Sequence, residues 1–258
     1  MKKTIICFSL LAAAMLFAAA CSPAAKEERP VQISAGNIKV TATDAKGGAE
    51  AVRAIIERER PVVDSVRRPL LGHAAKTHDK FRPESPLMNF AADALLYMAR
   101  KKCPAENVDA AVTNIGGLRD IIREGDVTFG SVYDVFPFEN TLALVTLDGV
   151  QMLQLCREIA AVGGEAVSGL RLVISADKRL LSATVNGSPI DPARKYVIAT
   201  SDYLSEGKDK LFVLKQGHAV KYESMVIRDL MVEYITSLEA EGKKLDSNCD
   251  GRIAVEGK

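Results

Sequence analysis

The sequence has few of the residue types from which metal centres and nucleic-acid surfaces are built. It contains three histidines and no tryptophan among 258 residues, and aromatic residues make up only 5% of the chain. Its 34 lysines and arginines are balanced by 33 aspartates and glutamates. No general basic surface is therefore available to attract nucleic acid. We expect no nucleic-acid polymer as a partner, and any binding site has to be local.

The chain also lacks the short motifs of common catalytic centres. It has no CxxC pair, no Cys/His ligand spacing, no nucleophile elbow and no convincing Ser/His/Asp set. His73 and His78 lie five residues apart and are followed by Asp79, but no further histidine lies near them. We expect these histidines to be exposed or capping residues, and we expect no metal site in this chain.

The first residues predict export rather than a folded element. Residues 1–20 combine two early lysines, an apolar run and a small-residue end, which is typical of a secretory signal and too short for a resident membrane helix. The "AAAC" that ends at Cys21 resembles a bacterial lipobox, which predicts lipidation of Cys21 and a membrane anchor, with ordinary signal cleavage as the alternative. Residues 21–48 are polar and weakly periodic, so we expect a tether there.

Three cysteines remain after the signal segment, Cys103, Cys156 and Cys249. Their number is odd and they lie far apart in the sequence. We expect three separate thiols, with one disulfide as the alternative.

Hydrophobic periodicity predicts a domain over residues 49–258 in which helices and strands are mixed. Pro61 is expected to end the first helix, Ser85 to cap the second and Gly242 to stop the last. Because no strict βαβ repeat appears, we expect an α+β fold with mixed sheets. The predicted helices cover 49–60, 85–102, 128–136, 149–162 and 223–242. The predicted strands cover 37–42, 108–113, 140–148, 170–175, 180–186, 196–201 and 252–255.

The stretch "TNIGGLRD" (113–120) follows a predicted buried strand and is a candidate binding corner. Glycines after a strand let the backbone approach a ligand closely. Arg119 offers a planar set of donors for phosphate, carboxylate or ribose oxygens, and Asn114 can both donate and accept. The alternative is a tight turn with a surface arginine.

Other stretches could complete a site for a flat base. Phe138 and Tyr203 offer ring faces, and stacking on such a face contributes roughly 1–3 kcal/mol per base. Asn140 offers an amide that can hydrogen-bond a base edge, and Asp209 a carboxylate that can accept from ribose hydroxyls.

Five stretches in a fixed order carry a family resemblance over roughly residues 62–240. They are "RPESPLMN…ADA" (82–94), "NIGGLR" (114–119), "GDVTFGSVYDVFPFEN" (125–140), "VSGLRL" (167–172) and "VNGSPID" (185–191). Together they resemble the C-terminal, substrate-binding domain of the 5'-nucleotidases, a family that includes UDP-sugar hydrolases and 2',3'-cyclic phosphodiesterases. The resemblance implies a layered α/β/α/β domain with mixed sheets.

The resemblance also implies a role for particular residues. Phe138 and Tyr203 fall where two aromatic rings sandwich the base, Asn140 where an asparagine binds the base edge, and Asp209 where an aspartate binds the ribose.

The remaining positions implied by the resemblance surround the phosphate and the sugar. Arg82 and Arg119 fall where arginines meet phosphate or ribose. Asn114 and Gly117 lie near them, and Gly169 is expected to line the pocket.

One departure from the family pattern lies beside Asp209. Where the family has GGDG, this sequence reads "GKDK" (207–210), so Lys208 and Lys210 replace glycines. These two ammonium groups either favour a phosphate-rich ligand, neutralise Asp209 or obstruct the pocket, and the sequence leaves the three outcomes open.

The chemistry of the family resides in a separate metallophosphoesterase domain, where two metals activate a hydroxide. Its D-x-H, G-D-x-x-D and G-N-H-[ED] motifs are absent from these 258 residues. We therefore expect no catalytic residues and no cofactor in this chain, with divalent metals on a partner.

Three hypotheses follow. The chain is the nucleotide-recognition subunit of an extracytoplasmic 5'-nucleotidase that works with a separate metallophosphoesterase chain, or it is a non-catalytic nucleoside- or nucleotide-binding lipoprotein, or it is a scaffold whose pocket no longer binds.

Overall fold

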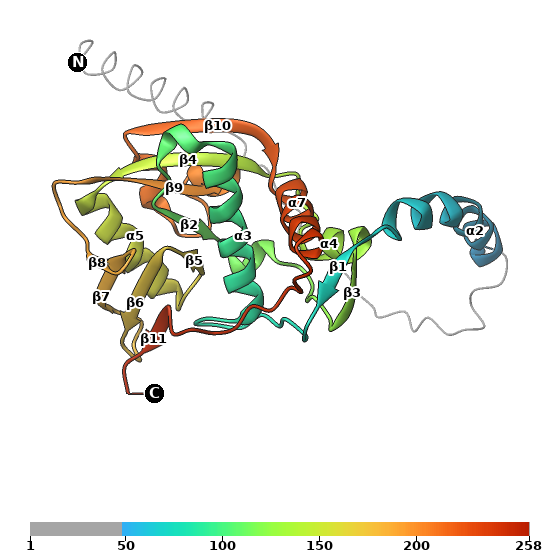
Figure 1. The fold of residues 1–258 in the computed structure, drawn as a ribbon, viewed down its shortest axis with the longest axis horizontal. Helices are drawn as coiled ribbons and strands as arrows, with labels where there is room; N and C mark the ends of the chain where they lie inside the picture. The colour runs from blue at the N-terminus through green and yellow to red at the C-terminus, as the bar shows by residue number, and fades with distance from the viewer. Residues whose placement is uncertain (1–47, 258) are drawn as a thin grey trace, which may run out of the picture. The chain divides into compact units, whose positions relative to one another are not determined.

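The computed structural model describes residues 48–257 (Figure 1). The predicted signal segment, the Cys21 anchor, almost all of the tether and the strand expected at 37–42 lie outside these residues, so they stay predictions. None of the helices in the described part of the chain is long and apolar enough to cross a membrane.

A five-stranded mixed sheet forms the centre of the domain. Strands β2 and β9 run parallel, and the other neighbours are antiparallel. In sheet order the strands are β10 (Ala219–Val226), β4 (Thr141–Asp148), β9 (Lys195–Ser201), β2 (Ala110–Thr113) and β5 (Ala166–Ser168).

Both faces of this sheet are buried, and they belong to two different hydrophobic cores. Successive side chains of a strand point to opposite faces. In β4, Leu142 and Leu144 therefore join one core while Val145 and Leu147 join the other. This two-sided burial explains why residues 142–145 of β4 form an unbroken apolar run instead of alternating with polar residues.

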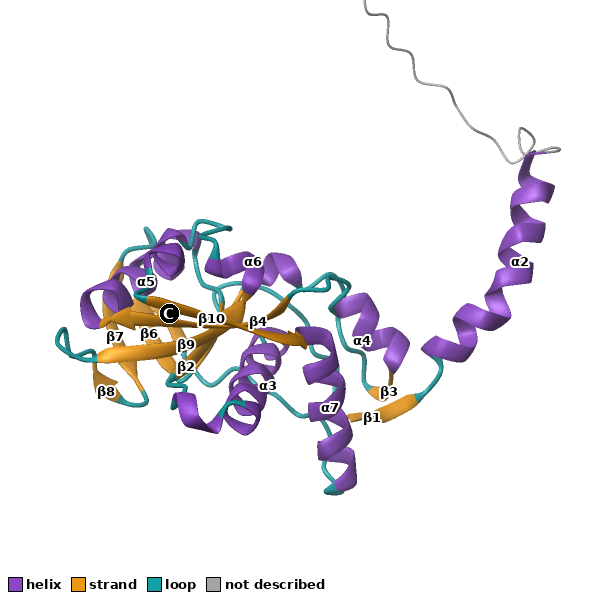
Figure 2. Cartoon of the chain, turned by 90° about the horizontal axis from the view of Figure 1, so that it is seen from above, coloured by secondary structure: helices purple, strands orange, loops and turns teal. Residues whose placement is uncertain are grey.

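Helices cover each face of the sheet (Figure 2). On one side lie α3 (Pro86–Lys102) and α7 (Ile227–Ala240), which contact each other and share the first core. On the other side lies α5 (Gly149–Val162), which contacts β4 and β9.

A second, four-stranded sheet packs on the far side of α5. Its order is β11 (Ile253–Val255), β6 (Leu170–Ile174), β7 (Leu180–Val185) and β8 (Ser188–Pro189). Since α5 contacts both β6 and β7, the order of layers is helix, sheet, helix, sheet. The predicted α+β fold with layered α/β/α/β architecture and mixed sheets is confirmed.

A small two-stranded sheet pairs β1 (Leu70–Ala74) with β3 (Gly125–Thr128). It leads into α4 (Phe129–Val135), and α2 (Gly48–Arg67) precedes β1. The other short elements within residues 48–257 are α6 (Asp202–Ser205) and the 3-10 turns η2 (Pro104–Glu106), η3 (Ile115–Gly117) and η4 (Phe212–Gln216).

Several predicted helix ends are confirmed in atomic detail. The Ser85 hydroxyl accepts the N–H of Met88 at 3.3 Å, which caps α3. Thr128 caps α4 through Ser131. These signals are local, so the sequence alone is enough to locate them.

The expectation that Pro61 ends the first helix was wrong. Helix α2 continues through Pro61 to Arg67. Proline lacks a backbone donor and its ring crowds the carbonyl four residues earlier, yet helical hydrogen bonding continues after it, since the N–H of Arg68 bonds to the carbonyl of Asp64 at 2.9 Å.

The predicted start of the last helix, at residue 223, was also wrong. Residues 223–226 belong to strand β10, and the helix starts at Ile227. Pairing of β10 with β4, through Tyr222–Ala143 and Val226–Thr141, overrides the helical pattern of this stretch.

Candidate functional site

Three strand ends meet at one edge of the central sheet. Strands β2 and β9 are parallel, so their last residues, Thr113 and Ser201, lie at the same edge. Strand β4 is antiparallel to β9 and begins at that edge, with Leu142 opposite Ser201. The segments that follow β2 and β9 and precede β4 are therefore brought together, although they are far apart in the sequence.

These segments enclose a cavity of about 340 Å³. That volume lies within the range of small-ligand pockets, roughly 300–1,000 Å³. We call it the Phe138 cavity. Its lining consists of Asn114, Gly116, Gly117, Arg119, Phe138, Asn140, Tyr203 and Asp209.

Both predicted aromatic residues contribute ring surface to this cavity. Phe138 is 48% exposed and Tyr203 is 41% exposed, so each ring has a face available to a ligand. The guanidinium carbon of Arg119 lies 5.9 Å from the centre of the Phe138 ring. The cavity therefore combines flat apolar surface with a cation beside it.

Asp209 links the two sides of the cavity. Its Oδ1 accepts the Tyr203 hydroxyl at 3.0 Å, and its Oδ2 accepts the Asn114 amide. The backbone of Asp209 has φ of +52°, in the left-handed region that aspartate tolerates better than most residues. The hydrogen bond to Asp209 raises the pKa of Tyr203, so the phenol stays protonated as the donor of this network.

Gly117 leaves room for the Asn114 side chain in this network. A Cβ at Gly117 would lie 2.8 Å from the Asn114 Oδ1, and one at Gly116 would lie 3.5 Å from the Asp209 Oδ2. Neither glycine has a positive φ. A side chain at Gly117 would therefore displace the Asn114 amide, whereas the distance at Gly116 is an ordinary van der Waals contact that leaves space for a Cβ.

Two predicted site residues lie elsewhere. Arg82 lines a neighbouring cavity, where it donates to the buried carboxylate of Glu165 and to the Gly164 carbonyl at 2.7 Å. Gly169 lies between β5 and β6 with φ of +74°, and a Cβ there would meet the Asp109 carbonyl oxygen at 2.6 Å. Gly169 does not line the Phe138 cavity. The turn between β5 and β6, with its positive φ, explains why glycine occupies this position.

Sequence reasoning missed two residues that support the site. Arg228 is buried in α7, donates to the carbonyls of Phe136 and Pro137 at 3.4 Å each, and so holds the segment that leads to Phe138. Nothing in the sequence around Arg228 marks this role.

Glu165 is the other missed residue. Its Oε2 accepts the N–H of Ile115 at 2.6 Å and its Oε1 accepts from Arg82. Burial raises the pKa of Glu165, with these two donors acting in the opposite direction. An acidic residue before a buried strand was the available signal.

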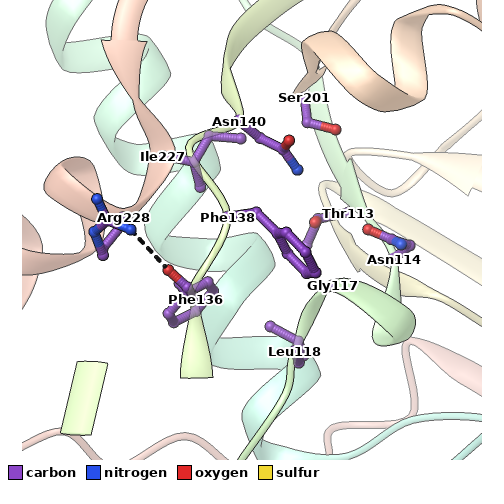
Figure 3. Close-up of a pocket in the computed structure, with 10 residues that line it drawn as sticks. All are labelled: Thr113, Asn114, Gly117, Leu118, Phe136, Phe138, Asn140, Ser201, Ile227 and Arg228. Atoms are coloured by element: carbon purple, nitrogen blue, oxygen red, sulfur yellow. Dashed lines mark hydrogen bonds between the residues drawn. The ribbon is translucent and has the colours of Figure 1, made fainter. Parts of the chain in front are cut away.

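A smaller hollow of about 30 Å³ shares Phe138 and Asn140 with the Phe138 cavity. In Figure 3 the Phe138 ring lies between Asn140 on one side and Leu118 on the other, and the dashed line marks the bond from Arg228 to Phe136. Phe138 therefore lines both the small hollow and the Phe138 cavity.

The histidines near the start of the domain have separate structural partners. His73 Nδ1 lies 3.0 Å from Glu239, while the Nε2 of buried His78 accepts the N–H of Ser247 at 2.9 Å. Burial lowers the pKa of His78. Within residues 48–257 no group of three or more His, Cys, Asp or Glu side chains has an arrangement that could hold a metal ion.

The cysteines of the described domain are free thiols. Cys103 and Cys156 are buried and Cys249 is exposed. The alternative of a disulfide among these three is therefore excluded in this structure.

Curated relatives were found at moderate identity. The chain is 28% identical over 185 residues to the cell wall protein Lmo0130 of Listeria monocytogenes, covering 66% of this chain and 23% of that protein. It is 30% identical over 185 residues to the trifunctional nucleotide phosphoesterase protein YfkN of Bacillus subtilis, covering 66% of this chain and 12% of that protein. The chain therefore spans less than a quarter of either relative.

A solved structure and a family model agree with these relatives. The 5'-nucleotidase precursor from Thermus thermophilus superposes with a TM-score of 0.71 at 25% identity, over 81% of this chain and 44% of that one. The model of the 5'-nucleotidase C-terminal domain matches residues 66–216. The chain belongs to the 5'-nucleotidase C-terminal domain family.

Proposed function

We propose that the Phe138 cavity binds a nucleoside or nucleotide, and that the chain is the recognition subunit of an extracytoplasmic 5'-nucleotidase. The observation that carries this proposal is the cavity itself. It combines two ring faces, an amide at Asn140 and a carboxylate at Asp209 in a volume of about 340 Å³. A purine needs flat stacking surface and an edge partner, and a ribose offers hydroxyl donors to a carboxylate.

Hydrolysis in this proposal depends on a second protein. Binding energy alone does not accelerate a reaction unless groups act in the transition state. The two-metal motifs are absent from these 258 residues, and the relatives extend well beyond the matched domain. A separate metallophosphoesterase chain would supply the metals and the nucleophilic hydroxide.

We place this function outside the cytoplasm, at a bacterial membrane. Residues 1–20 have the pattern of an export signal and Cys21 lies at the position of a lipid attachment. A relative named as a cell wall protein is consistent with export.

A second candidate is a lipoprotein that captures nucleosides or nucleotides without catalysis. It is favoured by the same absence of two-metal motifs from these 258 residues.

One experiment separates the candidates. Adenosine and AMP binding are measured by calorimetry, and a candidate metallophosphoesterase with divalent metal is then added while phosphate release is followed. Release only with both chains supports the recognition subunit, and binding without release supports capture. If neither ligand binds, the cavity has no nucleotide function and the proposal fails. Phosphate release by the purified chain alone with Mn²⁺ or Zn²⁺ would also contradict it.

A further inference from the structure

Helix α2 carries an apolar face that the rest of residues 48–257 leaves exposed. Aliphatic side chains along this face are each more than half exposed. They are Ile55, Ile56, Val62, Val63 and Val66. Exposed aliphatic residues scattered singly are ordinary on a protein surface, but a contiguous group of them marks an interaction site.

The spacing of these residues joins them into one stripe. With 3.6 residues per turn, positions 55, 62 and 66 fall on one face of the helix, and positions 56 and 63 lie beside them. The stripe runs along the helix for roughly 16 Å. We call it the α2 stripe.

The charged residues of the helix are ordered relative to the α2 stripe. Arg58 lies along one edge of the stripe, and Arg53 and Arg60 lie along the other edge. Glu57 and Asp64 lie on the opposite face of the helix. Basic side chains at the edges of an apolar face can reach the phosphates of lipid headgroups, while acidic side chains on the far face stay in water.

One acidic residue interrupts the α2 stripe. Glu59 lies one turn from Ile56 and one turn from Val62, and its Oε1 accepts the Arg58 Nε at 2.8 Å. Both side chains of this pair are more than half exposed, so the pair stays hydrated. A charged pair at this position restricts the helix to the headgroup region of a bilayer, because moving the two ions into hydrocarbon costs more than their attraction returns.

The same charges oppose pairing of the α2 stripe with a second copy of the chain. In a parallel pair of helices, Glu59 of one copy faces Glu59 of the other. In an antiparallel two-fold pair, the same edge of each helix meets itself, so Arg60 approaches Arg60 of the other copy. Like charges at such contacts are destabilising, whereas anionic lipid headgroups complement the arginines.

The predicted lipid anchor lies close to α2 along the chain. The 26 residues 22–47 separate Cys21 from Gly48, where α2 begins. A chain of that length spans at most about 90 Å even when fully extended. A lipid at Cys21 therefore keeps α2 at a high local concentration beside the bilayer surface.

We propose that α2 lies along the surface of a lipid bilayer, with the α2 stripe among the headgroups and Glu57 and Asp64 toward water. This inference rests on the membrane location in the proposed function, and it is independent of nucleotide binding. Apolar contact and attraction between arginine and phosphate supply the recognition. The helix is then a second membrane contact of the chain, beside the lipid at Cys21.

The test measures which face of α2 meets lipid. The full lipidated chain is reconstituted into vesicles of about three parts phosphatidylethanolamine to one part phosphatidylglycerol. A nitroxide probe is attached at Ile55→Cys, on the α2 stripe, or at Glu57→Cys, on the opposite face. Both variants carry Cys249→Ser, which removes the exposed thiol, and Cys103 and Cys156 are buried. Collisions of the probe with oxygen, which concentrates in lipid, are compared with collisions with a water-soluble nickel complex.

We expect the ratio of oxygen to nickel collisions to be about twofold or more higher for the probe at position 55 than for the probe at position 57. Equal ratios at the two positions would overturn the proposal. Spin–spin broadening of the probe at position 55 would also overturn it, since that result assigns the α2 stripe to a second copy.

A second measurement separates the helix from the anchor. The exported chain with Cys21→Ser carries no lipid, and its sedimentation with the same vesicles measures the contribution of α2. Ile55→Gln/Val62→Gln should lower the partition into vesicles roughly tenfold or more, because apolar surface is lost from the stripe. The matched control, Ala54→Gln/Ser65→Gln, changes exposed positions outside the stripe and should lower the partition less than about twofold.

Two results of this measurement would contradict the proposal. In one, the Cys21→Ser chain does not sediment with vesicles. In the other, the two double variants lower the partition equally. If the wild-type chain does not fractionate with membranes, the proposed location fails, and the Cys21→Ser chain with added vesicles still decides whether α2 binds lipid.

Discussion

Replacing Phe138 by alanine should weaken nucleoside binding without unfolding the domain. The Phe138 ring is 48% exposed and contributes its open face to the cavity. Stacking on an aromatic ring contributes about 1–3 kcal/mol per base. Loss of the ring should therefore raise the Kd for adenosine by roughly 5- to 150-fold.

The stability cost of this substitution should be smaller than for a core phenylalanine. A fully buried Phe replaced by Ala loses about 3–5 kcal/mol, and Phe138 is only half-buried. The contact with Arg119 at 5.9 Å is lost as well, which contributes about 0.5–1 kcal/mol at an exposed site. Thermal unfolding should still be cooperative.

Two control variants sharpen this measurement. Phe138→Tyr keeps the ring face and should bind adenosine with nearly wild-type affinity. Phe81→Ala removes an equally exposed ring, 50%, that lines neither cavity, and it should leave adenosine affinity unchanged. Calorimetry on the three variants is the assay. Wild-type affinity in Phe138→Ala, with saturable binding throughout, would refute the stacking argument.

Three further predictions test separate parts of the structure. Asp209→Asn should lower the pKa of Tyr203 toward the ordinary tyrosine value, because the carboxylate that accepts the hydroxyl proton and repels the phenolate is removed. The pKa of Tyr203 is measured by alkaline absorbance titration, as the difference from the Tyr203→Phe variant. An unchanged Tyr203 pKa in Asp209→Asn would contradict the hydrogen bond. Gly149→Ala should lower the free energy of unfolding in urea by at least about 1–3 kcal/mol, since the added Cβ would overlap a carbonyl oxygen of the β8–β9 loop. Wild-type stability of this variant would show that the loop can move away without cost. A thiol reagent at pH 8 should label exposed Cys249, and the Cys249→Ser variant should then lose one labelled thiol. Cys156 should react only after unfolding, because burial raises its pKa to about 12. Rapid labelling of Cys156 in the native protein would contradict its burial.

The parts of the fold that depend on local sequence were predictable. Ser85 and Thr128 cap helices through residues three positions away, and such signals are complete within one turn. Strand β10 was not predictable in the same way, because its state is set by pairing with β4 about 80 residues earlier along the chain.

The residues of the candidate site show the same difference between what the local sequence predicts and what long-range contacts decide. Phe138, Asn140, Tyr203 and Asp209 were identified from side-chain chemistry and motif order, and they line one cavity. That they bind a nucleotide stays a prediction. Arg82 was expected in the same pocket, but its partner Glu165 lies 83 positions away along the chain and holds it in the neighbouring cavity.

The supporting residues of the site were the least visible in the sequence. Arg228 acts on the Phe136 and Pro137 carbonyls from a helix 91 or 92 positions later in the chain. Only the packing of α7 beside α4 and the loop that follows it brings that guanidinium to the segment before Phe138.

A crystal structure of the chain soaked with adenosine tests the central claim most directly. The account predicts the purine stacked on Phe138 inside the cavity, with Asn140 at its edge and the ribose hydroxyls at Asp209. A purine bound elsewhere, or an empty Phe138 cavity at saturating adenosine, would contradict it.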